Sequence, residues 1–277
     1  MKVLVIDVGG THIKIASTDN PVPVKVVSGP SMTPKQMVAD VLAATLDWEY
    51  DAISVGYPGP VALDRPIAEP HNLGSGWVGF SYDTALPKPI RFINDAAMQA
   101  LGGYSGGKML FIGIGTGLGT ALIVDDVIVP LELAHLPYKK GKTYEEYIGL
   151  VGLEKQGKKL WRESVLDVVA ILRAAFVVDY VVLGGGNAKL MKQLPEGVRL
   201  GANSNAIMGG IALWSRPEAP QPRSTAPKTI DGPPASTTTS APPPKANKGK
   251  KKRDRVPPKV KAGTKSRKPK KHGKAKK

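Results

Sequence analysis

The sequence has 277 residues, enough for one large domain or for two lobes with buried cores. It contains no cysteine, which excludes disulfides, thiol catalysis and a metal site with cysteine ligands. The net charge of +16 is unevenly distributed, because residues 216–277 carry 20 Lys and Arg against 3 Asp and Glu, whereas residues 1–215 carry 19 against 20. The chain is therefore predicted to combine a nearly neutral folded part with a strongly basic tail.

The N-terminus does not have the pattern of a signal peptide. The apolar run that begins at Val3 ends after four residues, at Asp7. No apolar stretch approaches the roughly 20 residues needed to cross a bilayer. We therefore expect a cytoplasmic protein without a membrane partner.

The composition changes just after Trp214. Prolines spaced by Ser, Thr and Ala come first, and the last thirty-odd residues are mostly Lys, Arg, Gly and Pro. Almost no aliphatic or aromatic side chains are present there to offset the entropy of ordering. We predict one domain over residues 1–214 and a disordered tail over 215–277, Pro-rich at first and then Lys/Arg-rich.

The predicted elements of the domain alternate between strands and helices, which indicates an α/β fold. The first is a strand over Val3–Val8, a continuous apolar run that stops at Gly9-Gly10. The first half then continues with strands at residues 13–16 and 24–26, a helix at 33–48, a strand at 52–55 and a helix at 94–101.

The second half repeats this scheme. Strands are predicted at residues 109–114, 120–124 and 127–129, a helix at 163–176, a strand at 180–183 and a helix at 205–214. Each half opens with a strand and a Gly-Thr turn. This repetition predicts an internal duplication with two lobes, over approximately 1–105 and 106–214, and a cleft between them.

The first Gly-Thr turn, Asp7-Val8-Gly9-Gly10-Thr11, leads from one strand into another and not into a helix. That context excludes the usual dinucleotide-binding and P-loop motifs. Its backbone N–H groups and the Thr11 hydroxyl could hold an anion, and Lys14 would add positive charge. Asp7 could hold Mg²⁺ through water, because this ion prefers oxygen ligands. A simple β-turn is the alternative interpretation.

Two further glycine-rich loops also follow predicted strands. Residues 113–119 contain four glycines around a hydroxyl, and Gly184-Gly185-Gly186-Asn187 follows the strand at 180–183. Glycines at such points allow the backbone to approach an oxyanion closely. The added candidates for phosphate binding are Gly115, Thr116, Gly117, Gly119, Gly185 and Gly186.

These loops occur together with other short motifs in a characteristic order. The set consists of Asp7 to Thr11, Gly56-Tyr57-Pro58-Gly59-Pro60, Asn94-Asp95-Ala96, Gly113 to Gly119, Glu132-Leu133-Ala134-His135 and Leu183 to Gly186. In this order the chain resembles ROK-family sugar kinases over nearly all of residues 1–214. Within that family it looks most similar to the polyphosphate glucokinases, through residues 132–161 and the stretch from Asn72 to Gly79.

The resemblance implies an actin-like ATPase fold with two lobes of ribonuclease-H-like topology. It also implies a hexokinase-type phosphotransferase that phosphorylates glucose, at the 6-hydroxyl, from polyphosphate, ATP or both, with Mg²⁺. ROK proteins are commonly dimers, so we expect a homodimer. Many ROK proteins carry a zinc site with three cysteines, which this chain cannot form, and we expect no zinc.

Asp95 is the candidate for the group that takes the proton from the sugar. It lies at the predicted N-terminus of a helix, where the helix dipole keeps a carboxylate ionised. Phosphoryl transfer needs mainly alignment, charge neutralisation and a proton acceptor. Read without the family resemblance, Asn94-Asp95 would be a helix cap.

The resemblance assigns the sugar ring to Glu132, His135 and Glu145, although Glu146 lies next to the last of these. Asn72 and Asn94 are additional candidates, besides Asp95 itself. Trp77 is expected either against the sugar or in the core, and His12 and His71 match no family role and are interpreted as structural. Ala134 stands where the family usually has Gly, which could displace His135 slightly.

The basic tail leaves other interpretations open. We hypothesise that Lys245–Lys277 binds polyanions, either polyphosphate or nucleic acid, and a solubilising extension without a fixed partner is the alternative. A nucleic-acid-associated protein with a vestigial or regulatory kinase domain is a second class of function. A ROK kinase of another hexose, such as mannose, an N-acetylated hexosamine or allose, is a third. The first strand starts almost at Met1, which argues against the ROK repressors with an N-terminal helix-turn-helix.

Overall fold

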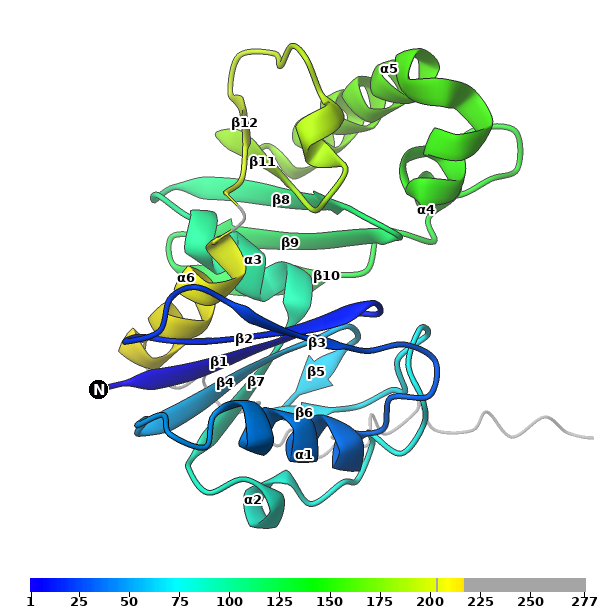
Figure 1. The fold of residues 1–277 in the computed structure, drawn as a ribbon. Helices are drawn as coiled ribbons and strands as arrows, with labels where there is room; N and C mark the ends of the chain where they lie inside the picture. Colours follow the sequence, from blue (N-terminus) through cyan, green and yellow to red (C-terminus); the bar gives the residue numbers. More distant parts are fainter. Residues whose placement is uncertain (203, 217–277) are drawn as a thin grey trace, which may run out of the picture. The chain divides into compact units, whose positions relative to one another are not determined.

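The computed structural model describes residues 1–202 and 204–216, which form two five-stranded sheets of the same topology (Figure 1). The strand order is β3-β2-β1-β4-β7 in the first sheet and β10-β9-β8-β11-β12 in the second. In both sheets the first strand in chain order pairs antiparallel with the second and parallel with the fourth. This is the arrangement that the predicted duplication requires.

The bounds of most strands agree with the sequence pattern. The first sheet contains β1 (Val3–Val8), β2 (His12–Ser17), β3 (Val24–Val27), β4 (Ala52–Tyr57) and β7 (Ile90–Asn94). The second contains β8 (Lys108–Ile114), β9 (Leu118–Val124), β10 (Val127–Leu131), β11 (Tyr180–Gly184) and β12 (Val198–Leu200). A small hairpin of β5 (Val61–Ala62) and β6 (Arg65–Pro66) lies outside both sheets. β7 and β12, the parallel edge strands, were not predicted.

The helices differ more from the sequence-based expectation. They are α1 (Pro34–Ala44), α2 (Tyr82–Ala85), α3 (Asp95–Gly103), α4 (Tyr144–Ile148), α5 (Leu150–Phe176) and α6 (Asn205–Ala212), with short 3₁₀ turns at Ala188–Leu190 and Leu213–Ser215. α1 begins as predicted, with the Thr33 side chain accepting a hydrogen bond from Gln36 N. It ends earlier than expected, where the buried Thr45 hydroxyl donates to Val41 O. α5 begins well before residue 163, and Gly157 interrupts it with a φ of 71°.

The alternation of side chains along β1 explains how the sheet separates two cores. Leu4, Ile6 and Val8 face the outer core beneath α1, whereas Val3 and Val5 face the core between the two sheets. Period-two alternation therefore directs Asp7 toward the inner side. β8 behaves in the same way, with Met109 and Phe111 on its inner face.

Helices α3 and α6 fill the space between the sheets (Figure 1). α3 follows the first sheet but packs on β8 and β9, and α6 follows the second sheet but packs on β1 and β4. The two helices cross at Gly102 and Gly209, where a Cβ on Gly209 would lie 1.8 Å from Met98 O. Each half of the chain thus contributes one helix to the core shared with the other.

The described chain ends at Arg216, whose guanidinium pairs with Asp126 at 3.1 Å. Asp126 belongs to the hairpin turn predicted between β9 and β10. The predicted disordered tail falls almost entirely on residues 217–277, outside the described part. In that described part, no helix is long and apolar enough to cross a membrane.

Candidate active site

The candidate residues gather where the parallel strands of the first sheet end. Asp7 of β1 lies opposite Gly56 of β4 in the ladder, and Tyr57 of β4 lies opposite Asn94 of β7. Because parallel strands bring their carboxyl ends to one edge, the β1–β2 turn and the start of α3 meet there. Ligands of open α/β sheets typically bind at this edge.

Asp95 is the first residue of α3 and is closely surrounded by protein atoms, although its surface is only half-buried. Its Oδ1 accepts a hydrogen bond of 2.7 Å from Ala96 N. Burial raises the pKa of Asp95 to about 7, and the nearby carboxylates of Asp7 and Glu132 add to this effect while Lys14 opposes it. A carboxyl with such a pKa near neutral pH can take up a proton during a reaction.

Asp7 is buried, with 4% of its surface exposed, and forms an ion pair with Lys14 in which Nζ and Oδ2 are 2.8 Å apart. Register explains the pair, since Asp7 and Lys14 are directly opposite on β1 and β2. The other carboxylate oxygen, Oδ1, lies near Gly56, where an added Cβ would come within 3.7 Å. This oxygen is suited to hold a hydrated Mg²⁺, so that the Asp7 carboxylate would interact with Lys14 through one oxygen and with the hydrated ion through the other.

The turn between β1 and β2 is compact. Gly9 N donates to His12 O at 3.1 Å, and the Ser28 hydroxyl donates to Gly9 O. The N–H of Gly9 is therefore used inside the hairpin, while Gly10 and Thr11 are exposed. A Cβ on Gly10 would lie 3.0 Å from the Cβ of Asn72, which places this candidate sugar residue directly beside the turn.

The second and third glycine loops form one continuous structure. Asn187 Nδ2 donates to Gly115 O at 3.0 Å, and Asn187 N donates to Ile114 O at the same distance. Gly185 has a φ of 80°, and a Cβ there would lie 2.4 Å from Ile114 O. Only glycine allows that approach with that conformation. The exposed Gly185, Gly186 and Thr116 thus share one surface.

This joined loop also reaches Asp95. A Cβ on Gly119 would lie 2.8 Å from the Cβ of Ala96, the residue after Asp95. Within the loop, Gly115 N donates to Gly117 O at 3.1 Å, so that this N–H is satisfied by the turn. The absence of a side chain at Gly119 allows the second sheet to approach the start of α3.

Glu132, His135 and Glu145 lie on the second half of the chain, near the joined loop. Glu132 and His135 are exposed, whereas Leu133 and Ala134 between them are buried. Glu145 N donates to Ala134 O at 3.0 Å. Burial raises the pKa of Glu132, while the charges of His135 and His71 lower it and that of Glu145 raises it further.

The geometry separates the two adjacent carboxylates at the start of α4. Glu145 Oε2 accepts from Leu118 N at 3.0 Å and borders Gly117, so that it faces the glycine loop. Glu146 forms a capping box with Thr143, accepting from Thr143 N at 2.9 Å. The structure therefore gives Glu146 a capping role and directs Glu145 toward the candidate site.

Two other candidates are held within the protein. Asn94 is buried and acts as the N-cap of α3, accepting from Ala97 N at 3.1 Å and donating to Gly59 O at 3.2 Å. Trp77, for which core and sugar positions were both expected, is fully buried and packs on Tyr57 with ring centroids 5.6 Å apart. Its indole nitrogen, Nε1, is buried and has no hydrogen-bond partner among the residues that the structure describes.

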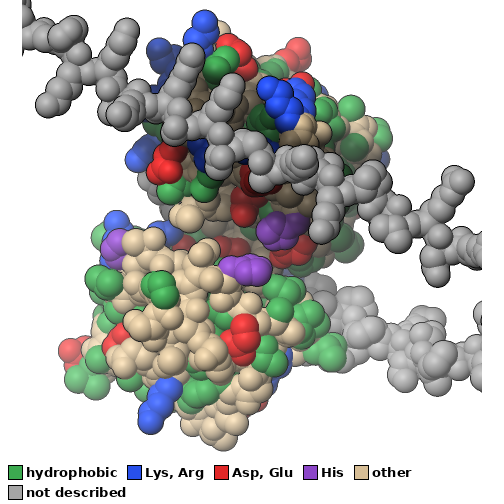
Figure 2. Space-filling model, turned by 90° about the vertical axis from the view of Figure 1, so that its right-hand side faces the viewer, with side chains coloured by type: hydrophobic (Ala, Val, Ile, Leu, Met, Phe, Trp, Pro, Cys, Tyr) green, Lys and Arg blue, Asp and Glu red, His purple; other side chains and the backbone are tan. Residues whose placement is uncertain are grey.

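The sequence analysis interpreted His71 as structural, but the structure brings it to the candidate site, beside His135. The rings of His71 and His135 are 6.2 Å apart in an edge-to-face arrangement. Figure 2 shows histidine and acidic side chains gathered around a hollow of the surface. No local pattern indicates this contact, because it depends on the packing of loops 64 residues apart in the sequence.

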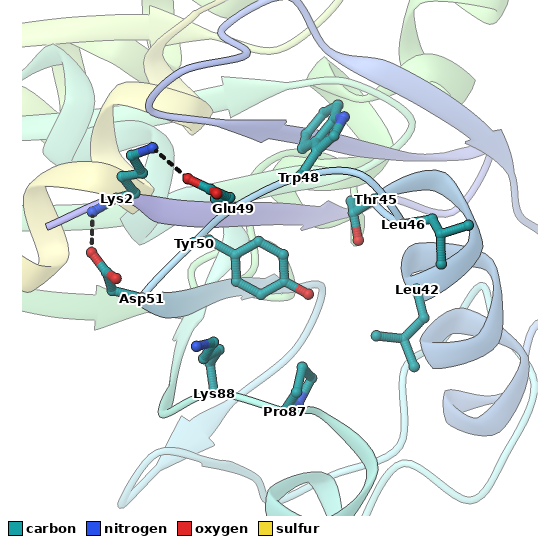
Figure 3. Close-up of a pocket in the computed structure, with 10 residues that line it drawn as sticks. All are labelled: Lys2, Leu42, Thr45, Leu46, Trp48, Glu49, Tyr50, Asp51, Pro87 and Lys88. Carbon is teal, nitrogen blue, oxygen red and sulfur yellow. Dashed lines mark hydrogen bonds and ion pairs between the residues drawn. The ribbon is translucent and has the colours of Figure 1, made fainter.

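A separate cavity of about 610 Å³ lies at the opposite edge of the first sheet (Figure 3). It is lined by the segments around Trp48 and Pro87, and it borders the ion pair between Lys2 and Glu49 at 3.1 Å. Lys2 N also donates to Asp51 at 2.7 Å. These residues precede β1, β4 and β7, so the cavity lies at the opposite ends of the parallel strands from the candidate active site.

Duplicated α/β halves that exchange helices, with glycine loops at the strand ends, define a protein of the actin-like ATPase fold. Solved structures of this kind match most of the chain. An inorganic polyphosphate/ATP-glucomannokinase from Arthrobacter sp. strain KM has a TM-score of 0.65 and 24% identity, covering 77% of this chain and 99% of that chain. A ROK family glucokinase from Streptomyces griseus, in complex with glucose and AMPPNP, has a TM-score of 0.60 and 16% identity, covering 76% and 99%.

A third structure, a ROK family protein from Streptococcus pneumoniae TIGR4 in complex with sucrose, has a TM-score of 0.62 and 16% identity, covering 77% and 98%. At these identities the likeness shows the fold. No curated protein sequence matches this chain. The model of the ROK family matches residues 3–129, and over this part of the chain the resemblance carried by the motifs is confirmed.

Proposed function

We propose that the protein is a hexokinase-type phosphotransferase that transfers a phosphoryl group to glucose or a related hexose, at the 6-hydroxyl. The observation that carries the proposal is the position of Asp95. Its carboxyl, whose pKa is about 7, lies between the ion pair of Asp7 with Lys14 and the base of the second glycine loop at Gly119. Such a position suits a group that faces both a phosphate chain and a sugar.

The proposed mechanism uses the chain's own residues mainly for alignment. The ionised Asp95 accepts the proton of the sugar hydroxyl. At the same time the hydroxyl oxygen of the sugar bonds to the terminal phosphorus, and the bond from this phosphorus to the leaving phosphate oxygen breaks. Gly10, Thr11 and Thr116 hold the phosphate chain through exposed backbone and hydroxyl groups. Mg²⁺, which Asp7 would hold through water, supplies charge neutralisation of the phosphates.

Glu132, His135, Glu145 and Asn72 form the sugar side in this proposal. Their carboxylates, imidazole and amide provide the mixture of donors and acceptors that vicinal hydroxyls require. Asn94 contributes by fixing the start of α3, since both ends of its side chain are bonded within the protein. The fully buried Trp77 supports the same region from the core.

The donor is proposed to be ATP, polyphosphate or both. The printed descriptions of two similar structures support this range, since one is a polyphosphate/ATP enzyme and the other holds AMPPNP. Gly185, Gly186 and Thr116 are exposed, and in this proposal their edge receives either a base or further phosphates. A single protein preparation can therefore be tested with both donors.

The experiment is a turnover assay of the purified chain with a panel of hexoses, with ATP or polyphosphate and Mg²⁺. We expect phosphorylation of glucose with at least one donor, and loss of about 10²- to 10⁴-fold in kcat for Asp95→Asn. Asp83→Asn, whose carboxylate is 67% exposed and pairs only at the surface with Arg65, is the matched control and should retain activity. Turnover of no hexose with either donor would refute the proposal.

A second candidate function rests on the charge of the C-terminal segment, which carries 20 Lys and Arg against 3 Asp and Glu from Arg216 on. Such a density predicts salt-dependent binding of polyphosphate or nucleic acid. Deletion of residues 217–277 should raise the KM for long-chain polyphosphate at low salt and leave the KM for glucose unchanged. An unchanged polyphosphate KM would contradict this prediction, and tight DNA binding without kinase turnover would favour a nucleic-acid-associated protein.

A further inference from the structure

The position of His71 is more typical of a binding residue than of a structural one. It and Asn72 are exposed, while their neighbours Pro70 and Leu73 are buried. The Glu132–His135 segment has the inverse pattern, with two exposed polar ends around a buried pair. Each segment therefore fixes its backbone in a core and presents its polar side chains at the same hollow.

The segment that carries His71 is anchored on both sides. The Tyr57 hydroxyl donates to Ala68 O at 2.8 Å, upstream of His71. Downstream, Gly74 N donates to Met32 O at 2.9 Å, and Glu69 accepts from Trp77 N at 3.1 Å. With its backbone held in this way, the imidazole of His71 loses little entropy when it binds a ligand.

The contacts of this segment link both sides of the candidate site. The ring of His71 meets that of His135 edge to face, at 6.2 Å between centroids. Its neighbour Asn72 abuts Gly10 of the first glycine turn. The two imidazoles are packed against each other, so a sugar ring would not enter between them but would meet their polar edges from one side. Each edge carries nitrogen atoms that can donate or accept a hydrogen bond.

We propose that His71 binds the hexose together with His135 and thereby sets the affinity for the sugar. The proposal rests on the proposed sugar kinase function and deepens it, because it adds a residue from the first half of the chain to a sugar side otherwise formed mainly by the second. Both histidines also act electrostatically on the Glu132 carboxylate, by lowering its pKa.

The first test separates sugar affinity from folding and from the donor site. His71→Ala should raise the KM for glucose by about three- to tenfold, with kcat and the donor KM nearly unchanged, because one hydrogen bond to a neutral partner is lost. His71→Gln, which keeps hydrogen-bonding atoms, should retain most of the affinity, whereas His71→Phe should behave like His71→Ala. His12→Gln, at an exposed histidine outside the pair, is the control and should leave the glucose KM unchanged.

Two results of these assays would overturn the inference. One is an unchanged glucose KM in His71→Ala. The other is retention of affinity by His71→Phe together with loss in His71→Gln, which would show packing in place of hydrogen bonding. In the double variant with His135→Ala, the glucose KM should rise by less than the product of the two single effects, because residues in contact are energetically coupled.

The second test needs no turnover and so distinguishes failure of this inference from failure of the proposed function. The chain has 4 histidines, whose imidazole proton resonances can be assigned by single substitution to Gln. Glucose added without a phosphate donor should shift the signals of His71 and His135 and leave that of His12 in place. If glucose shifts neither signal, the inference is wrong. If it shifts both in a protein that phosphorylates no hexose, the inference stands and the proposed function fails.

Discussion

At the scale of single residues, Asp95 experiences opposing influences that together place its titration near neutral pH. Burial and the carboxylates of Asp7 and Glu132 favour the protonated form, while the bond from Ala96 N and the charge of Lys14 favour the ionised one. A more exposed carboxylate, with a lower pKa, would be ionised at every pH near neutrality but would be a weaker base. The raised pKa means that ionisation of this carboxyl lowers the stability of the folded protein by a measurable amount.

The first prediction concerns the pH dependence that Asp95 imposes. The ionised form is the proposed proton acceptor, so kcat/KM should rise with pH through an apparent pKa near 7. The folded state binds this proton more tightly than the unfolded state, whose Asp has its ordinary value of 3.8. The contribution of Asp95 to stability is therefore full below that value and is lost as the pH rises toward 7.

Asp95→Asn removes this titration and should be more stable than the wild type at pH 8, by on the order of 1–3 kcal/mol. At pH 4 the two proteins should differ little. Urea unfolding at both pH values measures the difference, with Asp83→Asn as the control for loss of a surface carboxylate. Equal stability of Asp95→Asn and wild type at pH 8 would show that burial of the ionised Asp95 does not destabilise the protein.

What the sequence reveals at this scale depends on whether the signal is local. Asp95 follows Asn94 in a recognisable motif, and Glu145 could be told from Glu146 only once Glu146 was seen to cap α4. His71 has no local signal, since its partner His135 is brought to it by tertiary packing alone. Residues of this second type cannot be found without the fold.

At the scale of elements, the loop from Ala68 to Val78 has no regular structure and is nevertheless held by specific bonds. Glu69 is central to this, because its two carboxylate oxygens accept from Trp77 N at 3.1 Å and Val78 N at 3.0 Å. The bond from Val78 N is the main reason why the pKa of Glu69 is lowered. A side chain at the surface thus fixes the backbone that carries Asn72.

The second prediction is that Glu69→Gln loosens this loop. Because an amide oxygen replaces only one of the two acceptors, the glucose KM should rise by about two- to fivefold, with a small decrease in thermal stability. The depressed pKa of Glu69 means that its stabilising effect is present above the ordinary value of 4.5 and is lost as the pH falls below it. The difference in melting temperature from wild type should therefore disappear at acidic pH.

A suitable control for this loop variant is Glu49→Gln, at the opposite edge of the same sheet. Glu49 is 86% exposed and, within the described part of the chain, its ion pair is with Lys2 (Figure 3), so this substitution should leave the glucose KM unchanged. Scanning calorimetry and steady-state kinetics on both variants provide the comparison. If the two variants have equal glucose KM values, Glu69 does not position the loop.

The elements that the sequence could not indicate have an interrupted apolar pattern. β7 and β12 are short strands at the parallel edge of each sheet, and Arg91 or Arg199 interrupts their apolar character. The first part of α5 contains Gly157, whose positive φ breaks the helical periodicity. In contrast, β1 and β8 are buried over nearly their whole length, and residues 3–6 and 109–112 form unbroken apolar runs.

At the scale of the whole described part, the duplication places the two glycine-turn regions opposite each other. Each half lends a helix to the core of the other, so neither sheet has a complete inner core by itself. The sequence predicted two halves with a cleft, and the boundary near residue 105 stays a prediction. The exchange of α3 and α6 was not predictable, because it depends on which sheet each helix covers.

The third prediction concerns the contact that joins the two sheets. α3 and α6 cross with their backbones in contact, and a Cβ on Gly209 would lie 1.8 Å from Met98 O and 2.9 Å from Gly102 N. Neither atom belongs to a flexible side chain, so Gly209→Ala must separate the helices. We expect a loss of about 2–3 kcal/mol in the free energy of unfolding.

The same separation should affect function, because α3 begins at Asp95. A displacement of a catalytic group by about 1 Å can reduce the rate about a hundredfold. Met208→Ala, at a residue 54% exposed on the same helix, is the matched control and should change neither property substantially. Denaturant unfolding and kcat of both variants test this prediction. An unchanged unfolding midpoint in Gly209→Ala would mean that the helices do not cross as closely as the glycine contacts indicate.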